Sequence, residues 1–358
     1  MNNRRGRAVS ARWAVVALFL AAPGGAATFC VGTAAELHAA LLAAETNGED
    51  DFVRVRNGHY VGNFFYLANE VKSLQIVGGY VLLFGGCVRI SDDPATTALE
   101  PPGAGEVLAL TLSGSATAAV TPLLRVSLLT VQNGTRGLRL TNALDDQAVN
   151  FEVSRNRIVG ATDGGLLMNV IDGNVRINSN LFTGISSDNP GVALELSMPH
   201  VNSGSALYVT HNTIVDNQVL DAGSSHVSLV GAAGNEATFA NNIIRDNGWV
   251  DLFLDPDVET TVYNNDFELL VGTPDFESGN VDLPASFVDA AALDFRLAYG
   301  SLVRNLGHVA PPGGLPTVDI VGKPRNQPPL PDLGAWEVPW IFASGFEAGF
   351  SGWSSVVN

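Results

Sequence analysis

The feature of this chain that most constrains its fold is a pattern of four positions that recurs five times between residues 151 and 267. Apolar or β-branched residues occupy offsets 0, 2 and 7, and asparagine occupies offset 5 in every copy. Spacings of 24, 32, 30 and 23 residues between successive asparagines predict one solenoid turn per copy, with insertions of variable length. The asparagines are Asn156, Asn180, Asn212, Asn242 and Asn265.

The offsets also predict the local geometry of each copy. Offsets 0 and 2 have the period of a strand, and so have offsets 5 and 7, but the odd step between the two pairs requires a corner. Asparagine suits a corner because it tolerates left-handed backbone torsions and its amide can hydrogen-bond peptide groups that a bend leaves unpaired. Stacked copies would therefore place the five asparagines in an internal ladder along the solenoid axis.

A further apolar run lies between successive copies and predicts a third strand in each turn. Three short strands per turn, stacked at the ~4.8 Å spacing of paired strands, make a parallel β-helix. Long helical patterns are absent from this part of the sequence, which argues against βαβ units and leucine-rich repeats. We therefore predict an all-β fold with three strands per coil, and we expect the third strands at residues 166–168, 192–196, 227–230 and 252–254.

A solenoid leaves an open core at each end, and the sequence predicts how the N-terminal end is covered. Thr33 and Glu36 have the spacing of a capping box, and Leu37, Leu41 and Ala44 follow at the spacing of one helix face. We expect an N-terminal amphipathic capping helix that lies across the first coil.

Four segments near the N-terminus resemble, in the same order, the opening coils of pectin-lyase-like right-handed β-helix proteins. The resemblance covers nearly all of the chain after residue 27 and implies a right-handed parallel β-helix. Such folds host polysaccharide lyases, glycoside hydrolases and esterases, so the resemblance alone implies no single activity. The segments are VRVRNGHY at 53–60, LQIVGGY at 74–80, TALE at 97–100 and LLTVQNG at 128–134.

The segment 283–337 is similar to the choice-of-anchor Q region that closes many exported β-helices. Its most specific motif is the hexapeptide DLGAWE at 332–337, and one departure is Asn305, which stands where that family usually has aspartate. Residues 338–358 are similar to a short C-terminal tag of secreted bacterial proteins, which implies sorting or surface attachment. The supporting motifs are DFRL at 294–297, Gly300-Ser301, Asp319 and GKPR at 322–325.

The expected organisation begins with a signal peptide at residues 1–27, because a basic start, a ten-residue apolar stretch and a small-residue site follow one another. That stretch has about half of the ~20 residues that a membrane-spanning helix needs, so we expect export without a transmembrane segment. The cap and first coils are expected at 28–104, the coils with the ladder at 105–275, the closing region at 283–337 and the tag at 338–358.

Charge limits the partners of the exported chain. Without residues 1–27 it has 15 Lys and Arg against 36 Asp and Glu, a formal net charge of 15 − 36 = −21. Such a surface repels nucleic acid and anionic lipid headgroups, and it repels polyuronates unless cations bridge the contact. We expect no nucleic-acid partner. A polysaccharide or a cell-surface component remains the candidate partner, although solubility outside the cell is the simpler explanation of the acidity.

The two cysteines, Cys30 and Cys87, both lie in the exported part of the chain. In an oxidising compartment we expect a disulfide between them, and two separate buried thiols are the alternative. No His or Cys stands near either one at the spacing of metal ligands.

The sequence favours a secreted or surface-associated scaffold for binding or structural display, and a polysaccharide lyase or glycoside hydrolase is the alternative. The motifs of polygalacturonase-like hydrolases and of pectin methylesterases are missing. The residues of a calcium-dependent lyase are scattered across coils and leave no motif to check. Whether the chain is an enzyme therefore stays open, with the scaffold preferred.

The best acidic candidates are Asp216 and Asp246, which hold equivalent places in consecutive coils. Stacking would bring their carboxylates about 5 Å apart, where they could share a Ca²⁺ ion. Two solvated turn residues are the favoured alternative, and no cofactor is expected in that case.

The other polar and aromatic candidates form no catalytic constellation that the sequence reveals. We interpret lone histidines in this region as surface residues and the tryptophan as a packing residue, and we expect the arginines to balance neighbouring acids. These residues are His200, His211, His226, Trp249, Arg155, Arg157 and Arg245.

Overall fold

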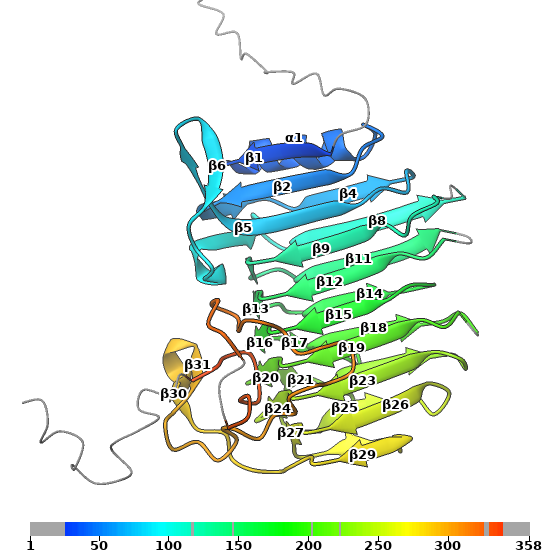
Figure 1. Cartoon of the computed structure of the whole chain (residues 1–358), viewed down its shortest axis with the longest axis vertical. Helices are drawn as coiled ribbons and strands as arrows, with labels where there is room; N and C mark the ends of the chain where they lie inside the picture. Colours follow the sequence, from blue (N-terminus) through cyan, green and yellow to red (C-terminus); the bar gives the residue numbers. More distant parts are fainter. Residues whose placement is uncertain are drawn as a thin grey trace, which may run out of the picture.

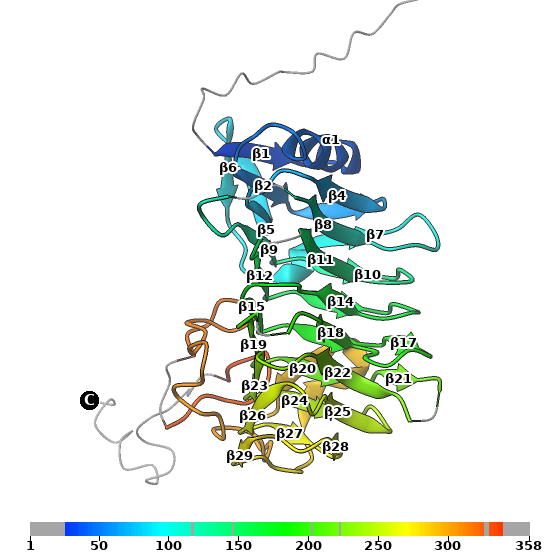
Figure 2. The same cartoon turned by 90° about the vertical axis from the view of Figure 1, so that its right-hand side faces the viewer.

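The structure is a computed structural model that describes residues 26–115, 118–144, 147–201, 203–221, 223–325 and 329–338. Three long sheets wind around one axis and confirm the predicted right-handed parallel β-helix with three strands per coil (Figures 1 and 2). The predicted signal peptide and C-terminal tag lie almost wholly outside the described residues, and both stay predictions.

Each sheet takes one strand from almost every coil, and we name the sheets A, B and C. Sheet A runs in the order β1 (Ala27–Val31), β2 (Asp51–Arg56), β5 (Leu74–Leu83), β9 (Leu123–Ser127), β12 (Asn150–Ser154), β15 (Val175–Asn178), β19 (Ala206–Thr210), β23 (Glu236–Ala240), β26 (Glu259–Tyr263) and β29 (Phe276–Ser278), with β6 (Gly86–Arg89) paired to β5. Sheet B contains β3 (Gly58–Val61), β7 (Thr97–Glu100), β10 (Thr130–Gln132), β13 (Arg157–Val159), β16 (Leu181–Thr183), β20 (Thr213–Val215), β24 (Ile243–Arg245) and β27 (Asp266–Phe267). Sheet C contains β4 (Phe64–Ala68), β8 (Leu108–Gly114), β11 (Leu138–Leu144), β14 (Leu166–Asn169), β18 (Leu194–Met198), β22 (Ser225–Gly231), β25 (Val250–Leu254) and β28 (Leu270–Val271).

Strand pairing within these sheets is parallel, apart from the antiparallel hairpin of β5 and β6. Offsets 0 and 2 of the repeat fall in sheet A, as with Phe151 and Val153, and offset 7 falls in sheet B, as with Ile158. These side chains are buried between the sheets together with the apolar runs predicted as third strands, which form β14, β18, β22 and β25 of sheet C. The core is therefore one continuous column inside the coils.

The repeated asparagines stand in a column at the corner between sheets A and B. In each rung the backbone amide and the side-chain amide of one asparagine donate to the Oδ1 atom of the next, at 2.9 and 3.1 Å from Asn156 to Asn180. The remaining amide hydrogen of Asn180 goes to the carbonyl of Val153, a group that the corner leaves unpaired. The rungs from Asn180 to Asn212, Asn242 and Asn265 repeat this arrangement.

One part of the sequence argument for the corner was wrong. The left-handed backbone belongs to the residue before each asparagine, where φ lies between 51° and 60°. The preceding residue turns the chain so that the asparagine side chain points inward to its neighbours, and this position accepts other residue types. The left-handed residues are Arg155, Ser179, His211, Asn241 and Asn264.

The ladder extends beyond the repeat at both ends. At its start, the backbone amide of Leu129 donates to Asn156 Oδ1. Leu129 therefore occupies the ladder position of the coil before Asn156, although its side chain is apolar. At its end, Asn265 donates to Asn280 Oδ1. A second, shorter ladder joins Asn217 to Asn247 by the same pair of hydrogen bonds, each 3.1 Å long.

The N-terminal end is covered as predicted. Helix α1 (Ala34–Ala44) lies across the first coil and contacts β1, β2 and β4 (Figure 2). Its first turn is capped by Thr33, whose Oγ1 accepts from the amide of Glu36, and Leu37 and Leu41 are fully buried on its inner face. The predicted disulfide between Cys30 and Cys87 is present and ties β1 to β6.

After β29 the chain turns back along the flank of the solenoid (orange in Figure 1). The hairpin of β30 (Phe287–Asp289) and β31 (Asp294–Leu297) and the segment up to residue 338 form a second apolar cluster with outward-facing residues of sheet B. No helix in the described part of the chain is long and apolar enough to span a membrane. The cluster includes Leu181, Val215 and Ile243 from the coils and Phe295, Val303, Ile320, Leu333 and Trp336 from the returning segment.

Candidate functional site

A cavity of about 490 Å³ opens between the outer face of sheet A and the returning C-terminal segment. Its floor is formed by outward-facing side chains of β9, β12, β15 and β19, and we call it the sheet A groove. Because these strands stack in parallel register, one outward position of each strand forms a row along the axis. The row is Arg125, Glu152, Arg176 and Tyr208.

The groove is basic although the chain is strongly acidic. Four arginines and two carboxylates line it, a local balance of 4 − 2 = +2, against a formal net charge of −17 for the full sequence. Charges separated by more than the ~8 Å screening length at physiological salt contribute little at the contact, so a ligand in the groove meets the local positive charge. The arginines are Arg89, Arg125, Arg155 and Arg176, and the acids are Asp92 and Glu152.

Three of the four arginines are held by these carboxylates. Arg125 Nε lies 3.3 Å from Glu152 Oε1, and Arg155 Nη2 lies 3.2 Å from Asp92 Oδ1. Arg89 lies 3.7 Å from the same Asp92 oxygen. Arg176 is exposed, and its side chain has no hydrogen bond or ion pair with any residue that the structure describes. It is therefore a cation that is ready to bind an external anion.

The wall of the groove depends on two close backbone approaches. The backbone of Gly313 lies against the ring of Tyr208, where an added Cβ would stand 2.5 Å from the ring. Gly322 approaches Asp92 in the same way, with 2.8 Å between its hypothetical Cβ and the Asp92 Cβ. Both glycines have positive φ, so a larger residue would be strained there as well as crowded. The C-terminal segment is thus fitted against this face.

The groove holds charge-pairing groups, and Tyr208 is the one further described lining residue whose side chain could transfer a proton. No histidine, lysine or cysteine is among its described lining residues, and both of its carboxylates are already paired with arginines. Burial lowers the pKa of Arg155, but its ion pair with Asp92 opposes that shift. A general base has to be available in its unprotonated form, which the guanidinium group is not. The arrangement of guanidinium groups is suited to binding a planar anion.

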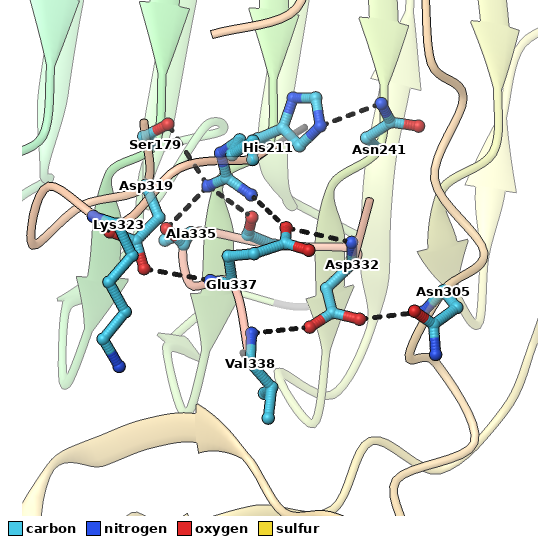
Figure 3. Close-up of polar contacts among 12 residues, drawn as sticks. Ser179, His211, Asn241, Asn305, Asp319, Lys323, Asp332, Ala335, Glu337 and Val338 are labelled. Carbon is cyan, nitrogen blue, oxygen red and sulfur yellow. Dashed lines mark hydrogen bonds and ion pairs between the residues drawn. The ribbon is translucent and has the colours of Figure 1, made fainter. Parts of the chain in front are cut away.

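A second polar cluster fastens the C-terminal segment to the coils (Figure 3). Arg325 is completely buried, and its Nη2 donates to the carbonyls of Gly334 and Ala335 at 3.0 and 2.6 Å and to Ser179 Oγ at 3.3 Å. Its Nη1 lies 3.7 Å from Glu337 Oε2. The guanidinium group therefore links the hexapeptide 332–337 to the corner of the β15 coil.

The acids around Arg325 hold the loops of the returning segment. Asp319 accepts from the amides of Lys323 and Glu337, at 2.7 and 3.0 Å. Asp332 accepts from the amides of Asn305 and Val338, both at 2.8 Å. Because position 305 contributes its backbone amide, the departure from aspartate there leaves this contact intact. The residues that resemble the choice-of-anchor Q region thus form one buried network with a structural role.

Burial dominates the protonation of this cluster. Desolvation, helped by the nearby charge of Asp332, raises the pKa of Glu337 to about 8. Desolvation also lowers the pKa of Arg325 and, with the charge of Arg325, holds the pKa of His211 well below its usual range. The ion pair with Arg325 and the hydrogen bond from the Asp332 amide oppose the rise of the Glu337 pKa, but at 3.7 and 3.2 Å they do not offset the loss of water.

The structure places the two predicted metal ligands side by side. Asp216 and Asp246 directly follow the paired strands β20 and β24, both are exposed, and both have positive φ. Burial and the charge of Asp246 raise the pKa of Asp216. No group of three or more potential ligands among His, Cys, Asp and Glu occurs in the described residues. The shared calcium site stays a prediction.

Several interpretations of single residues were wrong. His211 and His226 are completely buried, whereas we expected surface residues, and Trp249 is 58% exposed, whereas we expected a packing residue. The identity of a single residue does not indicate whether another segment of the folded chain covers its side chain. The prediction that arginines balance neighbouring acids is confirmed for Arg155, which pairs with Asp92, and for Arg245, which pairs with three acids. Arg157 forms no ion pair with the described residues.

Sequence reasoning did not find the sheet A groove. The available signal was the alternation within the repeat, which places Glu152, Arg176 and Tyr208 at the outward position between offsets 0 and 2. The contribution of Arg89 and residues 313–318 could not be read from the sequence, because they are far from the repeat along the chain.

Comparison with known proteins adds little to this picture. No protein-family model matches the sequence, and no curated protein matches it. Among solved structures, the chain is similar to one titled "Structure of PL6 family alginate lyase AlyGC", with 14% sequence identity and a TM-score of 0.41. The similarity covers 71% of this chain and 38% of that chain. The β-helix assignment depends on the strand pairing of this chain itself, and nothing of that lyase's activity is carried over here.

Proposed function

We propose that the protein is an exported β-helix scaffold that binds an acidic polysaccharide in the sheet A groove. The observation that carries the proposal is the exposed guanidinium group of Arg176, which has no partner among the described residues and lies in a basic groove of an acidic chain. Guanidinium groups bind carboxylates through two parallel hydrogen bonds, and the row from Arg125 to Tyr208 offers charged and aromatic contacts to successive sugar units.

Export is part of the proposal. The disulfide between Cys30 and Cys87 suits an oxidising compartment, and the predicted signal peptide would deliver the chain there. The segment 283–337, which resembles the choice-of-anchor Q region, supplies residues 313–318 to the groove wall. We infer that its role here is to complete the binding face, with the tag at 338–358 serving attachment.

Binding of polygalacturonate and alginate, measured by isothermal titration calorimetry, tests the proposal. Arg176→Ala should weaken binding at least about tenfold, because it removes a charge-assisted contact. Arg296→Ala is the matched control, since it removes the same charge from an exposed arginine outside the groove lining. Equal affinities of both variants and the wild type would contradict the groove as the binding site.

The alternative of a polysaccharide lyase is settled in the same samples. A lyase breaks the glycosidic bond by elimination and leaves a carbon–carbon double bond in one product sugar, which absorbs ultraviolet light. Absorbance should stay constant with each polysaccharide, with and without Ca²⁺, if the chain only binds. A steady rise that Arg155→Ala abolishes would instead assign the groove to a lyase.

A further inference from the structure

The hairpin formed by the end of β5 and by β6 carries large apolar side chains into solvent. Leu82, Leu83 and Phe84 at its tip are 54%, 43% and 107% exposed, and Val88 on the returning strand is 45% exposed. No charged residue occurs between positions 73 and 88. The hairpin projects from the coils at the N-terminal end of the solenoid (cyan in Figure 1). The rest of the described residues therefore leave this tip uncovered.

The residues at the tip do not suit the type of turn that they form. Phe84 and Gly85 connect the paired residues Leu83 and Gly86, and their φ angles are 52° and 79°. A two-residue turn with positive φ at both positions strongly favours Asn-Gly, and a bulky residue in the left-handed region is strained. Phe84 is thus neither suited to the turn nor packed in the protein, which points to a contact outside the molecule.

The tip is held in place before any contact is made. Leu82 pairs with Cys87 across the hairpin, and the disulfide from Cys87 to Cys30 fixes β6 to the first strand of sheet A. At the base, Arg54 lies over the rings of Phe52 and Tyr80 at 5.2 and 5.6 Å. The hairpin therefore presents a preorganised apolar tip above a cationic base, so little ordering is needed on contact.

We propose that this tip, defined as Leu82, Leu83 and Phe84, inserts into the interfacial layer of a phospholipid bilayer. Three protruding side chains bury well under the roughly 800 Å² per partner that a stable protein interface needs, whereas a lipid layer surrounds a narrow tip on all sides. Arg54, which donates to the carbonyl of Cys87, and the half-exposed Arg89 on β6 supply positive charge at the base of the hairpin. Zwitterionic lipid is the expected surface, because the acidic body of the chain is repelled by anionic headgroups.

Co-sedimentation of the full chain with phosphatidylcholine vesicles tests this inference. Phe84→Asn should lower the partition coefficient by about tenfold or more, because it removes the largest apolar side chain of the tip. The same change fits the turn, so the melting temperature should stay equal or rise. Leu42→Asn is the matched control, since Leu42 is 67% exposed on α1 and lies outside the tip; its partition coefficient should equal that of the wild type.

Three results would overturn the inference. The first is wild-type protein that stays in the supernatant at every lipid concentration, and the second is equal sedimentation of wild type and Phe84→Asn. The third is self-association without lipid that Phe84→Asn removes, measured by light scattering, which would assign the tip to a second copy of the chain. Arg176→Ala should sediment like the wild type, so the vesicle experiment and the polysaccharide experiment fail independently.

Discussion

The coils and the returning C-terminal segment bury polar groups in opposite ways. Along the asparagine column of the coils the buried groups are neutral amides, and each of Asn180, Asn212 and Asn242 has partners above and below it in the ladder. In the returning segment they are ions, with Arg325 fully buried beside Asp319, Asp332 and Glu337. A neutral ladder can be extended by any number of rungs, whereas the ionic cluster forms only when all of its members meet.

This difference predicts different responses to mutation and to pH. A neutral amide loses hydrogen bonds when it is replaced, but it has no titration in the usual pH range. A buried ion leaves its partners charged and unpaired, and its protonation depends on the burial itself. The asparagine column should therefore be insensitive to pH, whereas the returning segment and the buried acids of the coils, such as Asp251 and Asp266, should respond to it.

The largest effect is expected from Arg325→Ala. Removing one member of a buried ion cluster typically costs about 3–5 kcal/mol, because the remaining charges stay buried without a partner. Residues 283–338 should then become accessible to protease while the coils stay folded, as followed by limited proteolysis and hydrogen exchange. Arg296→Ala is the control and should cost under ~1 kcal/mol as an exposed pair. Loss of the coils and the segment in one step would show that the two regions are not separate in stability.

A smaller effect is expected within the ladder. Asn212→Ala should destabilise the coils by about 3 kcal/mol, because it leaves the amide groups of Asn180 and the carbonyl of Ile177 without partners. Asn280→Ala, at the half-buried end of the ladder, should cost only about 1 kcal/mol. Urea unfolding of both variants measures the difference, and equal costs would mean that position along the column does not matter.

The pH dependence of stability should reveal the contribution of Glu337 in the returning segment. Burial raises the pKa of Glu337 from 4.5 to about 8, so the folded state favours its protonated form. Its contribution is fully present below pH 4.5 and is lost as pH rises through about 8. Glu337→Gln should flatten this decline between the two limits. The fluorescence of Trp336 in the returning segment reports the transition, and an unchanged pH profile would count against the buried acid as its cause.

The smallest effect is expected at the paired aspartates on the coils. Asp216→Asn should change stability by under ~0.5 kcal/mol, because the residue is exposed and asparagine accepts its left-handed backbone equally well. A thermal melt with and without Ca²⁺ is the measurement. A melting temperature that Ca²⁺ raises in the wild type and leaves unchanged in Asp216→Asn would establish the predicted metal site.

Much of the fold was predictable because its information is local and repeated. Apolar positions two residues apart predicted strands, and the asparagine at a fixed offset predicted a corner in each coil. The same pattern failed at His211, because the left-handed position accepts many residue types and its burial depends on the distant segment that covers it. The hairpin tip left only a weak signal, since Phe-Gly is not a usual turn sequence.

By itself, the sequence determined that the chain winds into a parallel β-helix with a capping helix and an asparagine column, because each coil repeats the same short-range requirements. Only the tertiary structure decided which outer face became a basic groove. Arg125 and Arg176 stand on either side of Glu152 in three stacked strands, and residues 313–318 reach this groove from the far end of the chain. Which residues line the groove depends on the positions of the insertions and of the returning segment in the folded chain. No local sequence pattern determines these positions.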